Sequence, residues 1–560
     1  MAKFTVYQVL PRLFGAYASQ RLVQGSIHEN GCGKFNNFSG KALREIKALG
    51  ITHVWYTGVI EHATQTDYSD VGIRRDHAAV VKGKAGSAYA IKDYYDVDPD
   101  LAESVPDRMR EFENLVKRTQ QEGLKVIIDF VPNHVARQYE SDAKTPGVSD
   151  LGEKDDKNNG FSPQNNFYYL TGQAFQPHFD KADYQEFPAK ATGNDQFTAS
   201  PSINDWYETV KLNYGVDYFS NKEQYFNPLP DTWLKMKDIL LFWASKKVDG
   251  FRCDMAEMVP VEFWEWVINE VKLVYPNLIF IAEVYNPEEY RNYIFRGGFD
   301  YLYDKVGLYD TLRAVVCHGR SASEITRCWH SLEGIQDHML NFLENHDEQR
   351  IASEFFAGNP WLAIPALVVA ATMNRSPFMI YFGQELGEPG MDEEGFSGRD
   401  GRTTIFDYWA VESVQRWINN SKFDGGKLDD NQVKLRTLYR RVLCLLTEEN
   451  ALREGDFYDL HYANWNHKGY NPHRQYAFFR HFKGELLLIV ANFDRSPVEL
   501  TVNIPSESLT HFNLEQKTSV QYFDLLKEDT ERIKGELSSE QPISVLLDAS
   551  SAVILKFEKV

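Results

Sequence analysis

Apolar residues in this chain gather in short continuous runs, each of which follows an amphipathic stretch and a turn. Residues 107–122 mix polar and apolar side chains at helical spacing, Gly123 follows them, and the apolar run 124–130 comes next. Glycine is favoured just after a helix, and a continuous apolar run is typical of a strand buried on both faces of a parallel sheet. We therefore predict a helix over 107–122 and a buried strand over 124–130.

The same order of helix, turn and apolar run recurs along most of the chain. The other helices are predicted at 43–49, 233–246, 263–274 and 361–373. The other strands are predicted at 4–9, 51–57, 248–253, 278–282, 299–303, 339–343 and 378–382. Alternating β and α units in this number favour an α/β fold of the (β/α)₈ TIM-barrel type. A doubly wound open sheet is the structural alternative.

Two segments interrupt this alternation. Residues 135–227 contain no clear βα unit and are rich in Gly, Asn, Asp, Ser and aromatic residues, and so long a connection is rarely a bare loop. We predict an inserted domain there, after strand 3. From residue 451 onward short strand-like runs replace the helices, which predicts a C-terminal β-sandwich over 451–560. The barrel would then comprise residues 1–134 and 228–450.

Length indicates more than one domain, and charge limits the kinds of partner that the protein can bind. The 560 residues exceed one compact core, and the net charge of -20 disfavours nucleic acids and anionic membrane surfaces as partners. The five cysteines include no CxxC pair, so free thiols are expected. No signal peptide is recognisable near the N-terminus, which favours a cytoplasmic location. A secreted chain that had lost its signal peptide would look the same.

Candidate chemistry lies at the ends of the predicted strands, where TIM barrels carry their catalytic groups. Four strand ends bear charged or imidazole side chains, namely Asp129 with His134, Arg252 with Asp254, Glu283, and His346 with Asp347. Each residue alone has a plainer interpretation: a helix cap for an aspartate, a structural ion pair for the arginine, a core position for a histidine. Their conjunction at neighbouring strand ends favours a catalytic site, since buried charges are costly unless paired or used.

These residues resemble the four conserved regions of the α-amylase superfamily, glycoside hydrolase family thirteen. The matching segments are 129–134, 250–254, the strand that ends at Glu283, and 345–347, and they occur in the family's order. The resemblance implies that Asp254 is the nucleophile, Glu283 the acid/base and Asp347 the third carboxylate. Residues 88–95 resemble a further family segment, with Ala88 where Gly is usual. Substrate-binding roles are implied for Tyr89, His134, Arg252 and His346.

The implied function is a retaining glycosidase that hydrolyses α-1,4-glucosidic bonds in maltodextrin or starch- and glycogen-type glucans through a covalent glycosyl-enzyme intermediate. The alternative is a transglycosylase or isomerase of the same superfamily, similar to a maltosyltransferase or trehalose synthase. A non-catalytic binding relative is disfavoured because all three carboxylates are present. A neutral α-glucan oligosaccharide or polysaccharide is the expected partner.

The chain departs from the family after the nucleophile. Many α-amylases carry a Lys-His pair that helps to hold the glucan and a calcium ion, whereas this chain has Glu257 and Met258. Asn133 is the residue type that usually binds calcium at this position in the family, but an asparagine here could equally cap the turn. No cofactor is required for the chemistry, and the sequence leaves calcium open.

Overall fold

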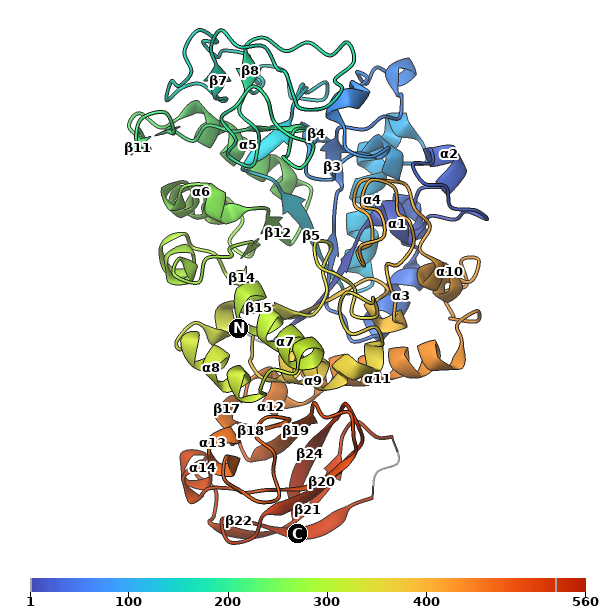
Figure 1. The fold of residues 1–560 in the computed structure, drawn as a ribbon, viewed down its shortest axis with the longest axis vertical. Coiled ribbons are helices and arrows are strands. Elements are labelled where there is room, and N and C mark those ends of the chain that lie inside the picture. Colours follow the sequence, from blue (N-terminus) through green and yellow to red (C-terminus); the bar gives the residue numbers. More distant parts are fainter. Residues whose placement is uncertain (1–2, 529–530) are drawn as a thin grey trace.

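Eight parallel strands close into a barrel in the computed structural model, which describes residues 3–528 and 531–560 (Figure 1). Met1 and Ala2, at the N-terminus where no signal peptide is recognisable in the sequence, lie outside the described residues. The barrel strands, in chain order, are β1 (Thr5–Val9), β2 (His53–Tyr56), β5 (Lys125–Phe130), β12 (Gly250–Cys253), β13 (Ile279–Ala282), β14 (Tyr301–Tyr303), β15 (Met339–Phe342) and β16 (Phe378–Tyr381). β1 pairs with both β2 and β16, so the sheet closes. The predicted TIM barrel is confirmed and the open sheet is excluded.

The longer helices around the barrel are α3 (Gly40–Ala48), α4 (Arg108–Gln121), α5 (Asp231–Ser245), α6 (Val261–Val274), α7 (Asp310–His318), α8 (Ser323–Ser331), α9 (Ile364–Thr372) and α11 (Asp430–Glu448). Of these, α3, α4, α5, α6 and α9 correspond to predicted ones, whereas α7, α8 and α11 were not predicted. Shorter helices are α1 (Pro11–Phe14), α2 (Ile27–Asn30), α10 (Glu412–Ile418), α12 (Asn450–Arg453), α13 (His461–Asn464) and α14 (Ser506–His511). Gly123, predicted as the residue that ends its helix, has φ +77°, a conformation that glycine adopts without strain.

The segment between β5 and α5 forms short two-stranded sheets at one end of the molecule (Figure 1). Its strands are β6 (His134–Ala136), β7 (Tyr169–Leu170), β8 (Ala189–Lys190), β9 (Thr209–Lys211), β10 (Val216–Asp217) and β11 (Glu223–Gln224). The hairpin of β3 (Ile60–His62) and β4 (Ile91–Val97) lies beside it. Several aromatic side chains of the segment are buried, among them Phe167, Tyr168, Tyr169, Phe175 and Tyr207.

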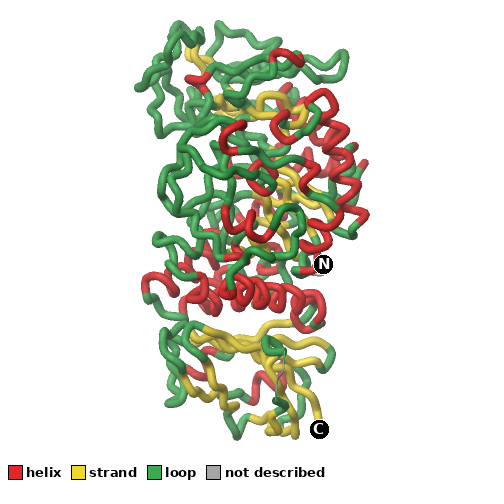
Figure 2. Tube along the Cα trace, turned by 90° about the vertical axis from the view of Figure 1, so that its right-hand side faces the viewer, coloured by secondary structure: helices red, strands yellow, loops and turns green. Residues whose placement is uncertain are grey.

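The C-terminal part forms two antiparallel sheets at the opposite end of the long axis (Figures 1 and 2). The larger sheet contains, in spatial order, β17 (Asp456–Asp459), β18 (Gln475–Phe482), β19 (Glu485–Asn492), β24 (Ser551–Lys559), β21 (Lys517–Asp524) and β22 (Ile533–Ser538). The smaller sheet pairs β20 (Val498–Val502) with β23 (Ile543–Leu547). Leu488 of the larger sheet and Leu500 of the smaller one share one apolar cluster, as expected for a sandwich.

The cysteines, the helices and the domain boundaries were also the subject of predictions from the sequence. All five cysteines are unpaired, as predicted. Within residues 3–528 and 531–560, none of the helices has the length and apolar character needed to cross a bilayer. The division at 134/135, 227/228 and 450/451 stays a prediction.

Arg480 of β18 joins the C-terminal sheet to the barrel. Its side chain is fully buried, and its guanidinium donates to the carbonyl oxygens of Met373 and Gly455 at 2.6 Å each. Met373 follows barrel helix α9, so this one side chain bonds to backbone on both sides of the junction. Burial lowers the pKa of Arg480 to about 9.

We expect Arg480→Met to destabilise the fold by about 2 kcal/mol or more, because buried carbonyl groups lose their donor. Thermal unfolding monitored by circular dichroism would measure the change. Arg495→Met, at an exposed arginine of the same part of the chain, is the matched control and should leave Tm unchanged. An equal Tm for the Arg480 variant and the wild type would contradict this role.

Candidate active site

A pocket of about 350 Å³ lies at the carboxyl ends of the barrel strands. Six of the seven predicted site residues line it: Tyr89, His134, Asp254, Glu283, His346 and Asp347. Asp254 directly follows β12, Glu283 directly follows β13, and Asp347 lies in the loop after β15. The barrel thus brings together residues that are far apart in the sequence, as predicted from their strand-end positions.

Arg252, the seventh predicted residue, lies beneath the pocket and contacts two of its carboxylates. Its Nη1 donates to Oδ1 of Asp254 at 2.8 Å, and its Nη2 lies 2.7 Å from Oε2 of Glu283. The second contact is an ion pair without the alignment of a hydrogen bond. The guanidinium is fully buried, and its carbon lies 5.2 Å from the ring centre of Trp55 and 5.3 Å from that of Tyr303. One buried cation therefore sets the positions of both carboxylates.

The protonation of Asp254 depends on this cation. Burial raises the pKa of Asp254 well above its ordinary value, and the carboxylates of Glu283, Asp129 and Asp347 act in the same direction. Arg252 lowers it. The short bond to Nη1 is accordingly the interaction that favours the ionised form that a nucleophile needs.

Glu283 receives further donors besides Arg252. The backbone N–H of Met255 donates to Oε2 at 2.9 Å, and the Tyr285 hydroxyl donates to Oε1. Met255 has φ +42°, a left-handed conformation that is uncommon for a residue with a side chain and typical of functional sites. These contacts orient the Glu283 carboxyl and stabilise the anion that remains after it gives up a proton.

His346 links the third carboxylate to Tyr89. Nδ1 of His346 lies 2.7 Å from the side-chain amide nitrogen of Gln8. Nε2 lies 2.5 Å from the Tyr89 hydroxyl and 3.2 Å from Oδ2 of Asp347. Burial lowers the pKa of His346 well below its ordinary value, with Arg252 acting in the same direction, so the ring is neutral.

Asp347 faces the open pocket more than the other carboxylates do. Burial, followed by the charge of Glu283, raises the pKa of Asp347 to about 7. Because 41% of its side-chain surface is still exposed, pocket water offsets part of this effect until a ligand displaces it.

The calcium ion that the family resemblance leaves open does not fit at Asn133. Nζ of Lys211 lies 2.5 Å from Oδ1 of Asn133, 3.2 Å from the Met258 carbonyl oxygen and 2.7 Å from Oδ1 of Asp195. Amide, carbonyl and carboxylate oxygens are the ligands that calcium prefers, but here they surround an ammonium group. A second cation at this point would meet the charge of the buried Lys211.

Sequence reasoning missed most residues on the pocket wall. These are Lys82, Ser87, Trp206, Glu208, Thr209, Met255, Tyr285, Ile405 and Phe406. Tyr285 follows Glu283 by two positions. In an extended chain, side chains two positions apart point to the same side, so the sequence could have placed Tyr285 beside Glu283. Lys82 and Glu208 form a buried ion pair at 3.2 Å.

Comparisons with known proteins agree with this geometry. A family model described as "Alpha amylase, catalytic domain" matches residues 28–425. Alpha-amylase 3 of Dictyoglomus thermophilum is 23% identical over 384 residues, which cover 66% of this chain and 68% of that protein. An alpha-1,4-glucan:maltose-1-phosphate maltosyltransferase of Cereibacter sphaeroides is 24% identical over 220 residues, or 35% of this chain and 37% of that protein.

A solved alpha-amylase from Anoxybacillus has a similar fold over the whole chain. The TM-score is 0.65 at 19% identity, and the match covers 100% of this chain and 98% of that one. At this identity the likeness concerns the fold alone.

We expect Asp347→Asn to stabilise the protein at neutral and alkaline pH. Since folding raises the pKa of Asp347 from the ordinary value of about 3.9 to about 7, its ionisation costs stability as pH rises between those values. The Tm gain of the variant should be near zero at pH 4 and largest above pH 7, measured by calorimetry across that range. A gain that does not depend on pH, or a loss above pH 7, would contradict the raised pKa.

Proposed function

Because this chain belongs to the family of alpha-amylase catalytic domains, we propose that it is a retaining glycosidase that hydrolyses α-1,4-glucosidic bonds in maltodextrin or starch- and glycogen-type glucans. The observation that carries the proposal is the contact of Arg252 with both Asp254 and Glu283 at the floor of one pocket. Two carboxyl groups that face one pocket are what double displacement at an anomeric carbon requires, and here one cation holds both of them in place.

In the proposed first step an oxygen of Asp254 attacks the anomeric carbon while Glu283 gives its proton to the leaving glycosidic oxygen. The sugar–oxygen bond breaks and a covalent bond from the sugar to Asp254 forms. Arg252 keeps Asp254 ionised before the attack. The Met255 N–H and the Tyr285 hydroxyl stabilise the Glu283 anion that results.

In the second step the Glu283 carboxylate takes a proton from water, and the water oxygen attacks the same anomeric carbon. The bond to Asp254 breaks and the configuration of the sugar is retained after two inversions. Asp347 and His346 are proposed to bond to sugar hydroxyls, with Asp347 bonding more strongly in the distorted transition state. Tyr89 and His134 are proposed to hold the same sugar unit.

The charge on the pocket wall favours a neutral glucan over a phosphorylated donor. Lys82 is the only lysine among the described lining residues, and its ammonium is already paired with Glu208. The lining also carries the acidic groups of Asp254, Glu283 and Asp347. A phosphate group would meet net repulsion there, so the maltosyl-phosphate chemistry named for the Cereibacter relative is the less favoured alternative.

We expect Asp254→Asn to lower kcat on maltoheptaose by on the order of 10⁴-fold or more, because no covalent intermediate can form. Glu283→Gln should cost about 10²–10⁴-fold, and less on a substrate with a nitrophenolate leaving group, which departs without a proton. Steady-state kinetics on both substrates measures these losses, with Asp548→Asn at a distant exposed position as the control. Near-normal turnover by the Asp254 variant would rule out the nucleophile assignment.

The products should separate hydrolysis from transfer. We expect maltoheptaose to yield glucose or short maltooligosaccharides in water, with a matching gain in reducing ends, and no dependence on added phosphate. Chromatography of reactions on maltoheptaose and on trehalose, with and without phosphate, makes the measurement. Longer oligosaccharides, trehalose or a sugar phosphate with little reducing-end gain would instead identify a transferase or isomerase.

A further inference from the structure

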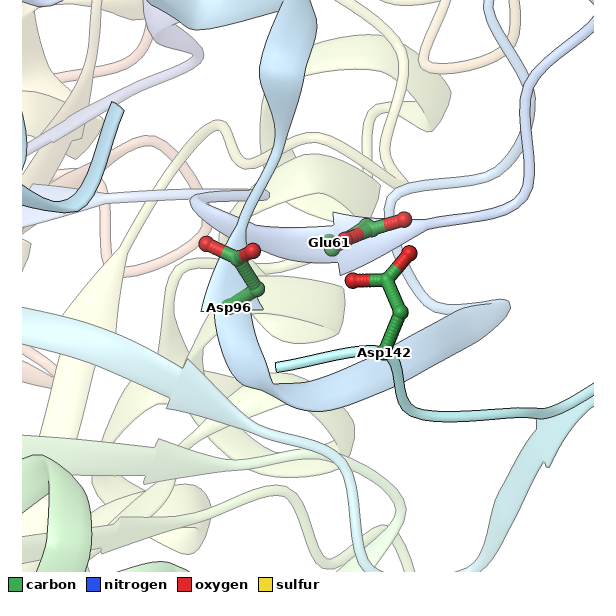
Figure 3. A group of neighbouring side chains, drawn as sticks. All are labelled: Glu61, Asp96 and Asp142. Atoms are coloured by element: carbon green, nitrogen blue, oxygen red, sulfur yellow. The ribbon is translucent and has the colours of Figure 1, made fainter. Parts of the chain in front are cut away.

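Three carboxyl groups converge where the β3–β4 hairpin meets the segment after β6 (Figure 3). Glu61 lies on β3, Asp96 on β4 and Asp142 on the loop that follows β6. One carboxylate oxygen from each lies within 4.8 Å of the other two. The Glu61 and Asp96 side chains are 1% and 5% exposed, and that of Asp142 is 32% exposed. The group is therefore buried on one side and reachable from solvent on the other.

Glu61 brings a buried oxygen without a partner to this group. Its Oε2 accepts no hydrogen bond, and its other oxygen lies 3.8 Å from Nζ of Lys92. Lys92 is closer to Asp76, at 3.2 Å. A buried carboxylate oxygen left in this state is costly unless a further cation reaches it.

The neighbouring charges do not balance the group. Arg108 contacts Asp96 and lies 3.9 Å from Asp142. Asp93 adds a further carboxylate, which accepts bonds from the Ser141 hydroxyl and from the Asp142 and Ala143 backbone N–H groups. Counting Asp76 and Glu140, six acidic side chains lie around the three cations Lys92, Arg108 and Arg74, which leaves an excess of negative charge.

We propose that Glu61, Asp96 and Asp142 bind a divalent metal ion of the calcium type. Calcium takes about six to eight oxygen ligands and is commonly held by several protein carboxylates, as this group would supply. Magnesium gives up its water reluctantly and is usually held by only one or two carboxylates, so a group of three favours calcium. The exposed edge of Asp142 leaves room for water to complete the coordination. The proposal uses none of the catalytic residues and is independent of the proposed function.

Burial and like charge act on all three groups in the absence of an ion. Burial raises the pKa of Asp96 to about 6, and it raises the pKa values of Glu61 and Asp142 in the same direction. An ion would remove this repulsion and join the hairpin to the inserted segment. β4 begins two residues after Tyr89 and β6 begins at His134, so the ion would stabilise two walls of the pocket.

The test uses the full chain after treatment with a chelator, followed by calcium chloride or magnesium chloride. We expect calcium to raise Tm progressively with its concentration, magnesium to raise it less, and titration calorimetry to give one strong calcium site. Asp142→Asn and Glu61→Gln should each abolish the calcium-dependent rise. Asp180→Asn, an exposed aspartate of the same inserted segment, should keep it.

Glu61→Gln also provides a readout without metal. Because it removes a buried oxygen that lacks a partner, its Tm in chelator should equal or exceed that of the wild type. A lower Tm in chelator would mean that Glu61 acts through Lys92 as an ordinary ion pair and would overturn the proposal. So would the lack of a calcium-dependent rise in the wild type, or an equal rise in both variants.

Discussion

The buried guanidinium of Arg252 is the interaction on which the site depends. It is fully enclosed by the barrel, and two of the carboxylates that line the pocket contact it. A charge buried at this depth is tolerated only when it is paired, and each carboxylate would likewise be costly without it. Barrel closure supplies the geometry, because β12 carries both Arg252 and the residue before Asp254 while neighbouring β13 leads into Glu283. The pairing of these strands therefore places the cation and the two carboxylates in one ion cluster.

The ion cluster around Arg252 contains more carboxyl groups than cations. The groups that the chemistry needs therefore cost folding stability. Asp129 and Asp347 join Asp254 and Glu283 around a single arginine, and burial raises the pKa values of Asp129 and Asp347 to about 6 and about 7. A fold selected only for stability would not gather these groups. Elsewhere the chain deals with buried charge differently: Lys211 supplies an internal ammonium beside Asn133, whereas Glu61 keeps an oxygen without a partner.

The barrel was predictable because its signal is local and repeated. Each apolar run, such as 124–130, reports a strand buried on both faces, and strand ends indicate where catalytic groups converge. The spacing of Arg252 and Asp254 already placed them on one side of a strand. The contact of Lys211 with Asn133 and the pair of Lys82 with Glu208 were not predictable, since they depend on the paths of long loops. For the same reason the sequence left calcium open at Asn133.

The central claim, that Asp254 forms the covalent bond to the sugar, is tested most directly by trapping that bond. A fluorinated maltosyl fluoride combines a good leaving group with slow release of the intermediate, so the glycosylated enzyme accumulates. Mass spectrometry of its peptides should place one added glycosyl group on the peptide that contains Asp254, with the fragment ions assigning it to that residue. A glycosyl group on Asp347 or Glu283, or turnover without any covalent species, would contradict the account.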